Sequence, residues 1–389
     1  MTTDEKLINR FKIPNNENLN DYAMNPIFKN SLIIKNGVMY ILGGVSSGKS
    51  TLISKLMAVY QRSIKPIITY FYSGLTPDET TTYAASVFGI KPHFVRLPTP
   101  EAMISFFNQY RLKRLKLAEL LMFLNSVFKS NTPALLAAVE FVEELGLTNE
   151  QIRTGSIRKR VDLAVDYVQS LIDKKRIITS ANKTEFIYTS EYLLKTYSRA
   201  HNVNFSTNPA LFVVNALISF SHGFKPQELT VDILNEPTIK PNKTDILSRF
   251  NHYQFEPFIR IENLTGNVKL SLVPTISVFD DVASFPLLTA ERSNQWTKDL
   301  LAETRRWMNT FIFAGQRHNL LNKTLRSLTH TFFIGYSLVD DDIPRIAKEI
   351  PSNLLSSDEF RLLYNNLIKP FTFFVYNNKL GYNVISLKQ

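Results

Sequence analysis

The segment Gly43–Ser50, with the sequence GGVSSGKS, constrains the fold of this chain more than any other stretch. It matches the pattern G-x-x-x-x-G-K-[ST], in which a glycine-rich turn joins a strand to a helix and binds phosphate groups. An apolar strand-like run at 38–42 precedes the turn, and a helical apolar repeat follows it at 51–63. This context favours a nucleotide phosphate site over the alternative, a glycine-rich turn that binds nothing.

The residue types in this loop fit phosphate binding. Gly43 and Gly48 let the backbone turn tightly and approach an anion without a Cβ in the way, and the N–H groups of the turn and the helix N-terminus converge on that anion. We expect Lys49 to reach the β- and γ-phosphates of ATP and Ser50 to bind Mg²⁺. The full set of expected nucleotide-binding residues is Gly43, Gly44, Val45, Ser46, Ser47, Gly48, Lys49, Ser50 and Thr51.

Strand-like and helical patterns alternate along two parts of the sequence. Beta-rich runs at 65–73 and 92–97 follow the phosphate loop, and the alternation resumes at 274–285 and continues to the C-terminus. Such an alternation predicts an α/β fold with a parallel-type central sheet. We therefore expect a P-loop NTPase core.

The middle of the chain has a different character. Long helical patterns dominate from about residue 99 to 222, and the first of them has Thr99 as its expected N-cap and Pro100 at its first helical position. Short β-like segments return at 256–263 and 267–273. The predicted organisation is an N-terminal arm at 1–30, a core at 31–105 and 265–389, and a mainly helical insertion at 106–264.

Two acidic residues end the apolar run ISVFDDV at 276–282. A P-loop enzyme needs a second, acidic strand to hold Mg²⁺ through water, and we expect Asp280 at the strand end to do this. Asp281 is then placed to polarise the water that attacks the γ-phosphate. The alternative is an ordinary strand that ends in a solvated Asp-Asp turn.

The segment after the acidic pair supplies further candidates. A helix is expected at about 293–308, followed by a strand at 310–314 that ends in Gly315-Gln316. Gln316 is a candidate sensor of the γ-phosphate or of the attacking water, or else a solvent-facing loop residue. Arg305 and Arg306 would lie at the end of the helix, where an arginine of a ring ATPase can reach the nucleotide of the neighbouring subunit; alternatively they complement the helix dipole.

The composition of the chain limits the kinds of binding partner that we expect. The formal net charge is +11 and cysteine is absent, which excludes disulfides and thiolate zinc sites. A basic chain favours a polyanion, above all nucleic acid. The basic runs at 111–116 and 156–160 could line a DNA path or be solvated helix faces, and the second is the interpretation we favour. The longest apolar stretches, 117–128 and 208–220, are shorter than the roughly 20 residues of a membrane span.

The order of these parts resembles the viral genome-packaging ATPases of the FtsK/HerA superfamily, specifically the poxvirus-type branch. The resemblance is carried by GGVSSGKST, VFDDV, RRWMNTFIFAGQ and LRSLTHTFFIG, and it covers about 30–105 and 270–340. On the family pattern Arg306 would be the family arginine, Gln316 the sensor and Arg326 the later arginine. Two departures are the large insertion and the second arginine, Arg305, which leaves open which of the pair is the finger.

The resemblance implies a RecA/FtsK-like ASCE core and an ATP-driven double-stranded DNA translocase that packages a viral genome into a preformed capsid. It further implies a homo-oligomeric ring, pentameric or hexameric, and a capsid vertex or portal protein as partner. We expect no membrane span, because the apolar stretches are too short. The site of action would be the host cytoplasm, or the nucleus of a eukaryotic host, at the capsid vertex during assembly. The alternatives are a DNA-transfer or mobilisation ATPase of the same superfamily, and a non-motor P-loop switch or assembly scaffold.

Overall fold

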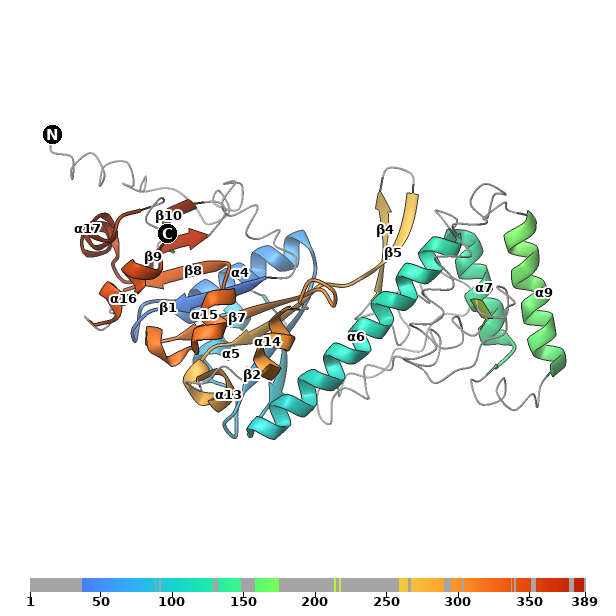
Figure 1. Ribbon diagram of the computed structural model, residues 1–389, viewed down its shortest axis with the longest axis horizontal. Helices are drawn as coiled ribbons and strands as arrows, with labels where there is room; N and C mark the ends of the chain where they lie inside the picture. The colour runs from blue at the N-terminus through green and yellow to red at the C-terminus, as the bar shows by residue number, and fades with distance from the viewer. Residues whose placement is uncertain are drawn as a thin grey trace. The chain divides into compact units, whose positions relative to one another are not determined.

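The computed structural model contains an eight-stranded sheet with helices on both of its faces, and further helices with a two-stranded sheet (Figure 1). The predicted N-terminal arm at 1–30 and most of the segment 175–258 lie outside the described residues. The described residues are 37–87, 89–90, 92–128, 132–147, 158–174, 213–214, 217, 259–264, 267–289, 295–302, 304–336, 338, 341–350, 355–377 and 381–387.

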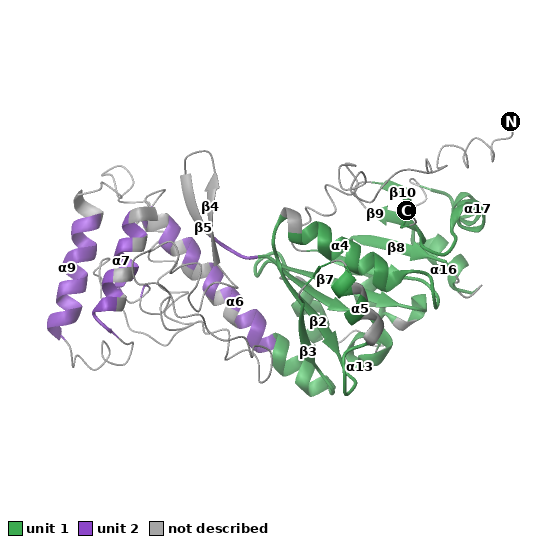
Figure 2. Cartoon of the chain, turned by 180° about the vertical axis from the view of Figure 1, so that it is seen from behind, with its two compact units in different colours: residues 1–107, 274–389 green, residues 108–273 purple. Residues whose placement is uncertain are grey.

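The chain divides into two compact units, coloured separately in Figure 2. The first, here called the sheet unit, comprises residues 1–107 and 274–389, and the second, the helical unit, comprises residues 108–273. Helix α6, Pro100–Phe128, begins in the sheet unit and continues into the helical unit. The domain limits expected from the sequence stay a prediction.

The eight strands of the sheet unit occur in the order β10-β9-β8-β1-β7-β6-β2-β3. Six of them, from β8 to β3, are parallel, whereas β9 is antiparallel to β8 and β10 is antiparallel to β9. The strands are β1 Val38–Leu42, β2 Ile67–Tyr72, β3 His93–Arg96, β6 Thr275–Phe279, β7 Asn309–Gly315, β8 Thr331–Gly335, β9 Thr372–Asn377 and β10 Gly381–Ser386.

The remaining elements connect these strands or form the helical unit. None of the helices within the described ranges is long and apolar enough to cross a membrane. In the sheet unit they are α4 Lys49–Ser63, α5 Glu79–Val87, η2 Val282–Ser284, α13 Pro286–Thr289, α14 Gln295–Ala302, η3 His318–Leu320, α15 Lys323–Leu328, α16 Asp342–Glu349 and α17 Ser357–Leu367. The helical unit adds α7 Thr132–Glu144, α9 Arg158–Lys174, β4 Ile259–Leu264 and β5 Asn267–Leu272.

The two faces of the large sheet bury different kinds of side chain. Beneath α4 the face is largely aliphatic, with Met39 and Ile41 packed against Leu52 and Leu56. On the opposite face one aromatic residue per strand forms a row in register across neighbouring strands, which packs large rings against each other. This row consists of Tyr382, Tyr376, Phe332, Tyr40, Phe313, Phe279 and Phe71.

Several sequence predictions are confirmed in detail. The strand at 38–42 is β1, and the helix expected at 51–63 begins two residues earlier, at Lys49. The Thr99 hydroxyl oxygen accepts a hydrogen bond of 3.2 Å from the backbone N–H of Ala102, as expected of an N-cap, and α6 begins at Pro100.

The prediction of a helix at 293–308 is wrong in its extent, because α14 ends at Ala302 and residues 304–308 form a turn. The Trp307 side chain is fully buried, and Met308 has a positive φ of 52°, which a helix cannot accommodate. Arg305 and Arg306 are therefore exposed residues of a turn that follows α14, and not part of the helix itself.

One basic run of the helical unit also differs from expectation. Arg114, in the centre of the run at 111–116, is buried, and its guanidinium donates a hydrogen bond of 2.8 Å to the carbonyl of Val273. It also lies 5.8 Å from the centre of the Tyr110 ring. Arg114 is therefore a packing residue of the helical unit and neither a DNA contact nor part of a solvated face. Residues 158–160 of the other run are exposed.

Candidate nucleotide site

The phosphate loop leaves β1 and enters α4 through two residues with left-handed backbone. Ser46 has a φ of 59° and Gly48 a φ of 96°, and a Cβ on Gly48 would lie 2.7 Å from Phe371 Cδ1. The backbone N–H of Phe371 also donates a hydrogen bond of 3.0 Å to the carbonyl of Ser47. Glycine is therefore required at position 48 both for its conformation and for the close approach of the turn before β9.

Two further backbone hydrogen bonds fasten the start of the loop to neighbouring strands. The N–H of Gly43 donates to the carbonyl of Gly315 at 3.2 Å, and the N–H of Gly44 donates to the carbonyl of Tyr336 at 2.9 Å. Gly315 ends β7 and Tyr336 follows β8, the two strands that flank β1. The loop is thus positioned by the carboxyl ends of both neighbouring strands.

Lys49, the first residue of α4, folds back over the loop. Its Nζ donates hydrogen bonds of 2.9 Å to the carbonyls of Gly43 and Gly44. Burial lowers the pKa of Lys49, while the charges of Asp280 and Asp281 act in the opposite direction. A phosphate on the loop would likewise favour the charged form of this lysine, because an opposite charge nearby stabilises it.

The acidic pair lies beside the start of α4. Asp280 directly follows β6, and its Oδ2 accepts a hydrogen bond of 3.1 Å from Ser50 Oγ. Hydroxyl and carboxylate oxygens are ligands that Mg²⁺ prefers, so this pair fits a magnesium site. Asp281 caps the short helix η2: its carboxylate accepts hydrogen bonds from the N–H of Ala283 at 3.2 Å and from the Ser284 hydroxyl at 2.8 Å.

A cavity of about 480 Å³ opens over these groups. Val45, Ser46, Lys49 and Ser50 of the loop line it, together with the acidic pair Asp280 and Asp281 and the sensor candidate Gln316. The other expected loop residues, Gly43, Gly44, Ser47, Gly48 and Thr51, are not part of the lining. Parallel strands place their carboxyl ends at one edge of a sheet, which is why segments far apart in the sequence meet here.

Arg305 and Arg306 do not join this cavity. They precede the first residue of β7, whereas Gln316 follows its last residue, Gly315. A strand of seven residues spans about 20 Å, which separates the arginine turn from the cavity of the same chain. Both arginines are exposed. Neither arginine is among the residues that line the cavity of this chain.

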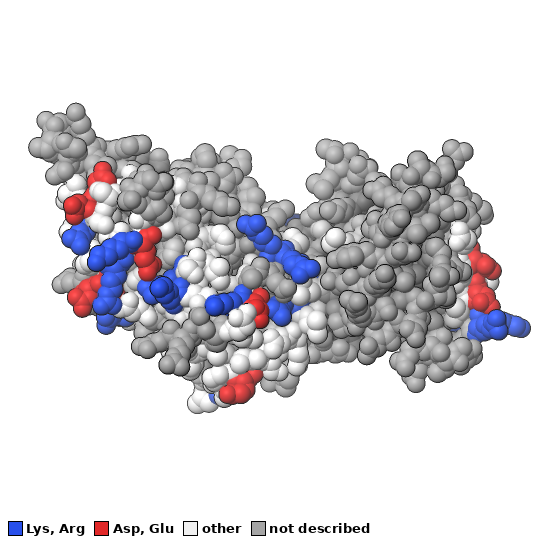
Figure 3. Space-filling view, viewed as in Figure 1, with Lys and Arg blue, Asp and Glu red and all other residues white. Residues whose placement is uncertain are grey.

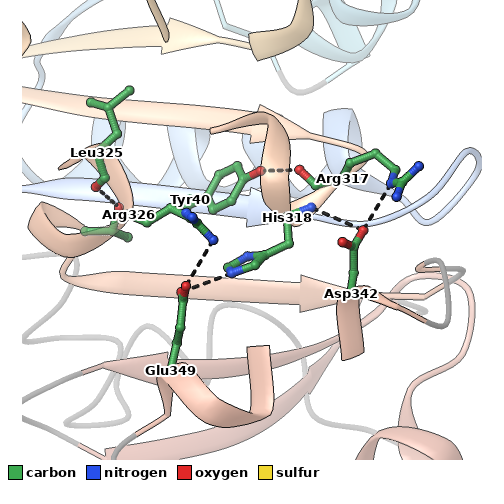
Figure 4. A network of polar contacts seen from close by, with 8 residues as sticks. Tyr40, Arg317, His318, Leu325, Arg326, Asp342 and Glu349 are labelled. Atoms are coloured by element: carbon green, nitrogen blue, oxygen red, sulfur yellow. Dashed lines mark hydrogen bonds and ion pairs between the residues drawn. The ribbon is translucent and has the colours of Figure 1, made fainter. Parts of the chain in front are cut away.

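Arg326, the later arginine of the family resemblance, forms an ion pair within the chain. Its NH1 lies 3.0 Å from Glu349 Oε1, and the buried His318 ring places Nε2 3.0 Å from Glu349 Oε2 (Figure 4). Although burial acts to raise the pKa of Glu349, the hydrogen bond and charge of His318 and the charge of Arg326 hold it below its usual value. Arg326 thus links α15 to α16 in this structure.

The sequence reasoning missed one wall of the cavity. This wall comes from the end of β2 and the following turn, residues 70–74 and 76–78, together with Phe94 of β3. The turn is held by Arg96, whose Nε donates a hydrogen bond of 2.7 Å to the carbonyl of Gly74. A signal was present, because a polar turn after a strand that pairs with the acidic strand must lie at the same edge of the sheet.

These features define a P-loop NTPase core. The strand that carries the phosphate loop, β1, and the strand that carries the acidic pair, β6, are separated by β7, which ends at Gln316. This strand order, with the loop geometry, agrees with the α/β P-loop fold of RecA/FtsK type expected from the sequence.

No family model matches the sequence, and no curated protein matches it. Among solved structures, the chain is similar to the genome packaging NTPase B204 from Sulfolobus turreted icosahedral virus 2 in complex with AMP. The identity is 8% and the TM-score 0.40, over 92% of this chain and 100% of that one. The same protein in complex with AMPPCP is 9% identical with a TM-score of 0.37, over 91% of this chain and 99% of that one. A further structure is that of B204, the DNA-packaging ATPase from Sulfolobus Turreted Icosahedral Virus. It is 10% identical with a TM-score of 0.36, over 91% of this chain and 98% of that one.

Proposed function

We propose that this protein hydrolyses ATP and couples hydrolysis to the translocation of double-stranded DNA, packaging a viral genome into a preformed capsid. The observation that carries the proposal is the meeting of Lys49, Ser50, Asp280, Asp281 and Gln316 around one cavity at the carboxyl edge of the sheet. The five groups come from three strand ends of a P-loop core.

Each group has a role in this chemistry. Lys49 releases the loop carbonyls to bind the β- and γ-phosphates. Ser50 and Asp280 would hold Mg²⁺, which would supply neutralisation of the phosphate charge. Asp281 orients and polarises the attacking water, and Gln316 contacts the γ-phosphate or that water. Catalysis in this class of reaction is mainly positioning and electrostatic stabilisation.

The arginine turn supports a ring. Because Arg305 and Arg306 lie at the opposite edge of the sheet from the cavity, either one can act only on the nucleotide of a neighbouring subunit. This requires a head-to-tail interface, in which the arginine edge of one subunit faces the nucleotide edge of the next. Such an interface forms a ring when the rotation between subunits closes. We propose a homo-oligomer of five or six subunits.

DNA as the polyanion is supported by the net charge of +11 and by the sequence resemblance. On the face drawn in Figure 3, the described Lys and Arg side chains are interspersed with Asp and Glu. The positive charge that would attract DNA is therefore a property of the whole chain. Contacts to the DNA backbone would be largely independent of the DNA sequence. By the same resemblance, the protein would act at a capsid vertex or portal in the host cell.

The test is steady-state ATP hydrolysis by the purified protein, alone and with linear duplex DNA, single-stranded DNA or RNA, at low and moderate salt. Lys49→Ala is the control that removes the site and should abolish hydrolysis. Stimulation by duplex DNA that weakens as salt rises supports the translocase. A hydrolysis rate that no nucleic acid changes favours a nucleotide switch or assembly scaffold instead. Full activity of Lys49→Ala contradicts the site assignment itself.

The same assay does not separate packaging from DNA transfer or mobilisation, since both tasks need a DNA-stimulated motor. That distinction needs a second measurement: ATP-dependent protection of duplex DNA from nuclease in the presence of empty capsids of the parent virus. Protection with capsids supports packaging. Stimulated hydrolysis without any protection favours the transfer ATPase.

A further inference from the structure

The backbone on both sides of Gln316 is fastened to the strand that carries the phosphate loop. On one side, the carbonyl of Gly315 accepts the hydrogen bond of 3.2 Å from Gly43, the first residue of the loop. On the other side, the carbonyl of Arg317 accepts a hydrogen bond of 2.9 Å from the hydroxyl of Tyr40, in the middle of β1 (Figure 4). Gln316 thus lies between two residues whose carbonyls are held by β1 and its loop, through the Tyr40 hydroxyl and the Gly43 N–H.

Tyr40 is well suited to hold a fixed position. Its side chain is fully buried, and its ring is a member of the aromatic row, packed edge-on against Phe332 with ring centres 6.3 Å apart. A Cβ on Gly315 would lie 3.0 Å from the Tyr40 hydroxyl, so the strand passes directly over that group. Burial raises the pKa of Tyr40 far above its ordinary value, so the hydroxyl keeps its proton and remains a donor.

A second group holds the same backbone from α16. Oδ2 of the buried Asp342 lies 3.3 Å from both the backbone nitrogen of His318 and Nε of Arg317, and each nitrogen donates a hydrogen bond to it. The His318 ring is held in turn by Glu349 (Figure 4). Residues 317 and 318 therefore cannot shift away from the sheet freely, and the Tyr40 hydroxyl sets their position relative to β1.

We propose that Tyr40 is a positioning residue for hydrolysis: its hydroxyl holds the backbone beside Gln316 in register with the phosphate loop. This inference rests on the proposed function, because it gives Gln316 a role at the γ-phosphate. Displacement of such a group by a fraction of an ångström to one ångström lowers the rate of the chemical step while leaving most ground-state binding intact. Tyr40 acts through Gln316 and does not itself line the cavity.

The experiment uses Tyr40→Phe, which removes the hydroxyl and keeps the ring. Tyr60→Phe is the matched control, because Tyr60 is also fully buried and its hydroxyl lies 3.9 Å from the sulfur of Met39 on the other face of β1. Both variants are compared with Gln316→Ala and with the double variant of Tyr40→Phe and Gln316→Ala. The measurements are kcat and KM for ATP, the Kd of a fluorescent ATP analogue, and the Tm.

We expect Tyr40→Phe to lower kcat about fivefold to tenfold, with KM and Kd within about twofold of wild type. Tyr60→Phe should retain wild-type kinetics. In the Gln316→Ala background, Tyr40→Phe should lower kcat no further, since the hydroxyl acts through the missing side chain. A merely structural role would instead lower kcat by the same factor in both backgrounds.

Three results overturn the inference, and they are distinguishable from failure of the proposed function. A Tyr40→Phe kcat equal to that of Tyr60→Phe overturns it, and so does an equal further loss in the Gln316→Ala background. A wild-type kcat for Gln316→Ala overturns it as well, by removing the group through which Tyr40 acts. In all three cases the wild-type protein still hydrolyses ATP, whereas an inactive wild type refutes the proposed function along with the inference.

Discussion

Asp281 has two roles in this structure that a single substitution can separate. Its carboxylate caps η2 through Ala283 and Ser284, and in the proposed mechanism it polarises the attacking water. Asparagine caps helices about as well as aspartate, so Asp281→Asn should change the free energy of unfolding by only about 0.5 kcal/mol or less. The loss of the carboxylate base should lower the rate of hydrolysis by about 10²–10⁴-fold.

The assay combines three measurements on one preparation. Thermal unfolding measures the loss of stability when the helix cap is changed. Equilibrium binding of a non-hydrolysable ATP analogue measures the affinity of the nucleotide site, and single-turnover hydrolysis measures the rate of the chemical step. Ser284→Ala is the matched control, because it removes the 2.8 Å hydrogen bond to Asp281 while leaving the carboxylate in place. It should cost about 0.5–1 kcal/mol of stability and leave hydrolysis within a few fold of wild type.

Two outcomes would refute this reasoning. If Asp281→Asn no longer binds the analogue, Asp281 serves the structure of the site and another group polarises the water. If Asp281→Asn hydrolyses ATP at the wild-type rate, the residue is only a helix cap. In either case the carboxylate at the far wall of the cavity, Asp78, becomes the next residue to substitute.

Three other perturbations test separate parts of the structure. Gly48→Ala should lower stability by about 1–3 kcal/mol and abolish nucleotide binding, whereas Gly89→Ala, with the same left-handed backbone but open space around its Cβ, should bind normally in the same titration. Mixing Arg306→Ala subunits with subunits that lack the phosphate-loop lysine should restore hydrolysis; recovery with Arg305→Ala instead would transfer the role to Arg305. The pKa of Glu349 lies below its ordinary value of 4.5, so its contribution to stability is present above that pH and is lost as pH falls through the lower, folded value. Glu349→Gln should therefore lower the Tm at pH 7. This loss should become smaller as the pH falls below 4.5, and a loss that does not change with pH would contradict the assignment.

Local signals explain why the phosphate loop and its flanking elements could be predicted from sequence. An apolar run such as 38–42 is typical of a strand buried on both faces, and the turn after it has few conformations open to it. Thr99 and Pro100 mark the start of α6 for equally local reasons. The acidic pair and Gln316 could be proposed because a phosphate loop requires such partners. Their large separation from the loop in sequence does not by itself indicate that they lie beside it in the fold.

The parts that could not be predicted depend on contacts between distant residues. The turn at 304–308 looks helical in sequence, and only the burial of Trp307 and the left-handed backbone of Met308 end α14 at Ala302. Likewise nothing in the sequence around Tyr40 distinguishes it from any other aromatic residue of a buried strand. Its hydroxyl becomes informative only because β7 pairs beside β1 and brings Arg317 within hydrogen-bonding distance.

Strand β7 carries, at its two ends, the groups that would serve two different nucleotides. Gln316 follows the end at the subunit's own cavity, and the turn with Arg305 and Arg306 precedes the end that would face a neighbour. All seven residues of the strand are buried, and it pairs in parallel with β1 and β6, so it can shift only as a packed element of the sheet. In a ring built this way, neither group can change position independently of the strand that joins them. Under the proposed function, a shift of β7 caused by the nucleotide in one subunit would therefore also move the arginines that face the nucleotide of the next subunit.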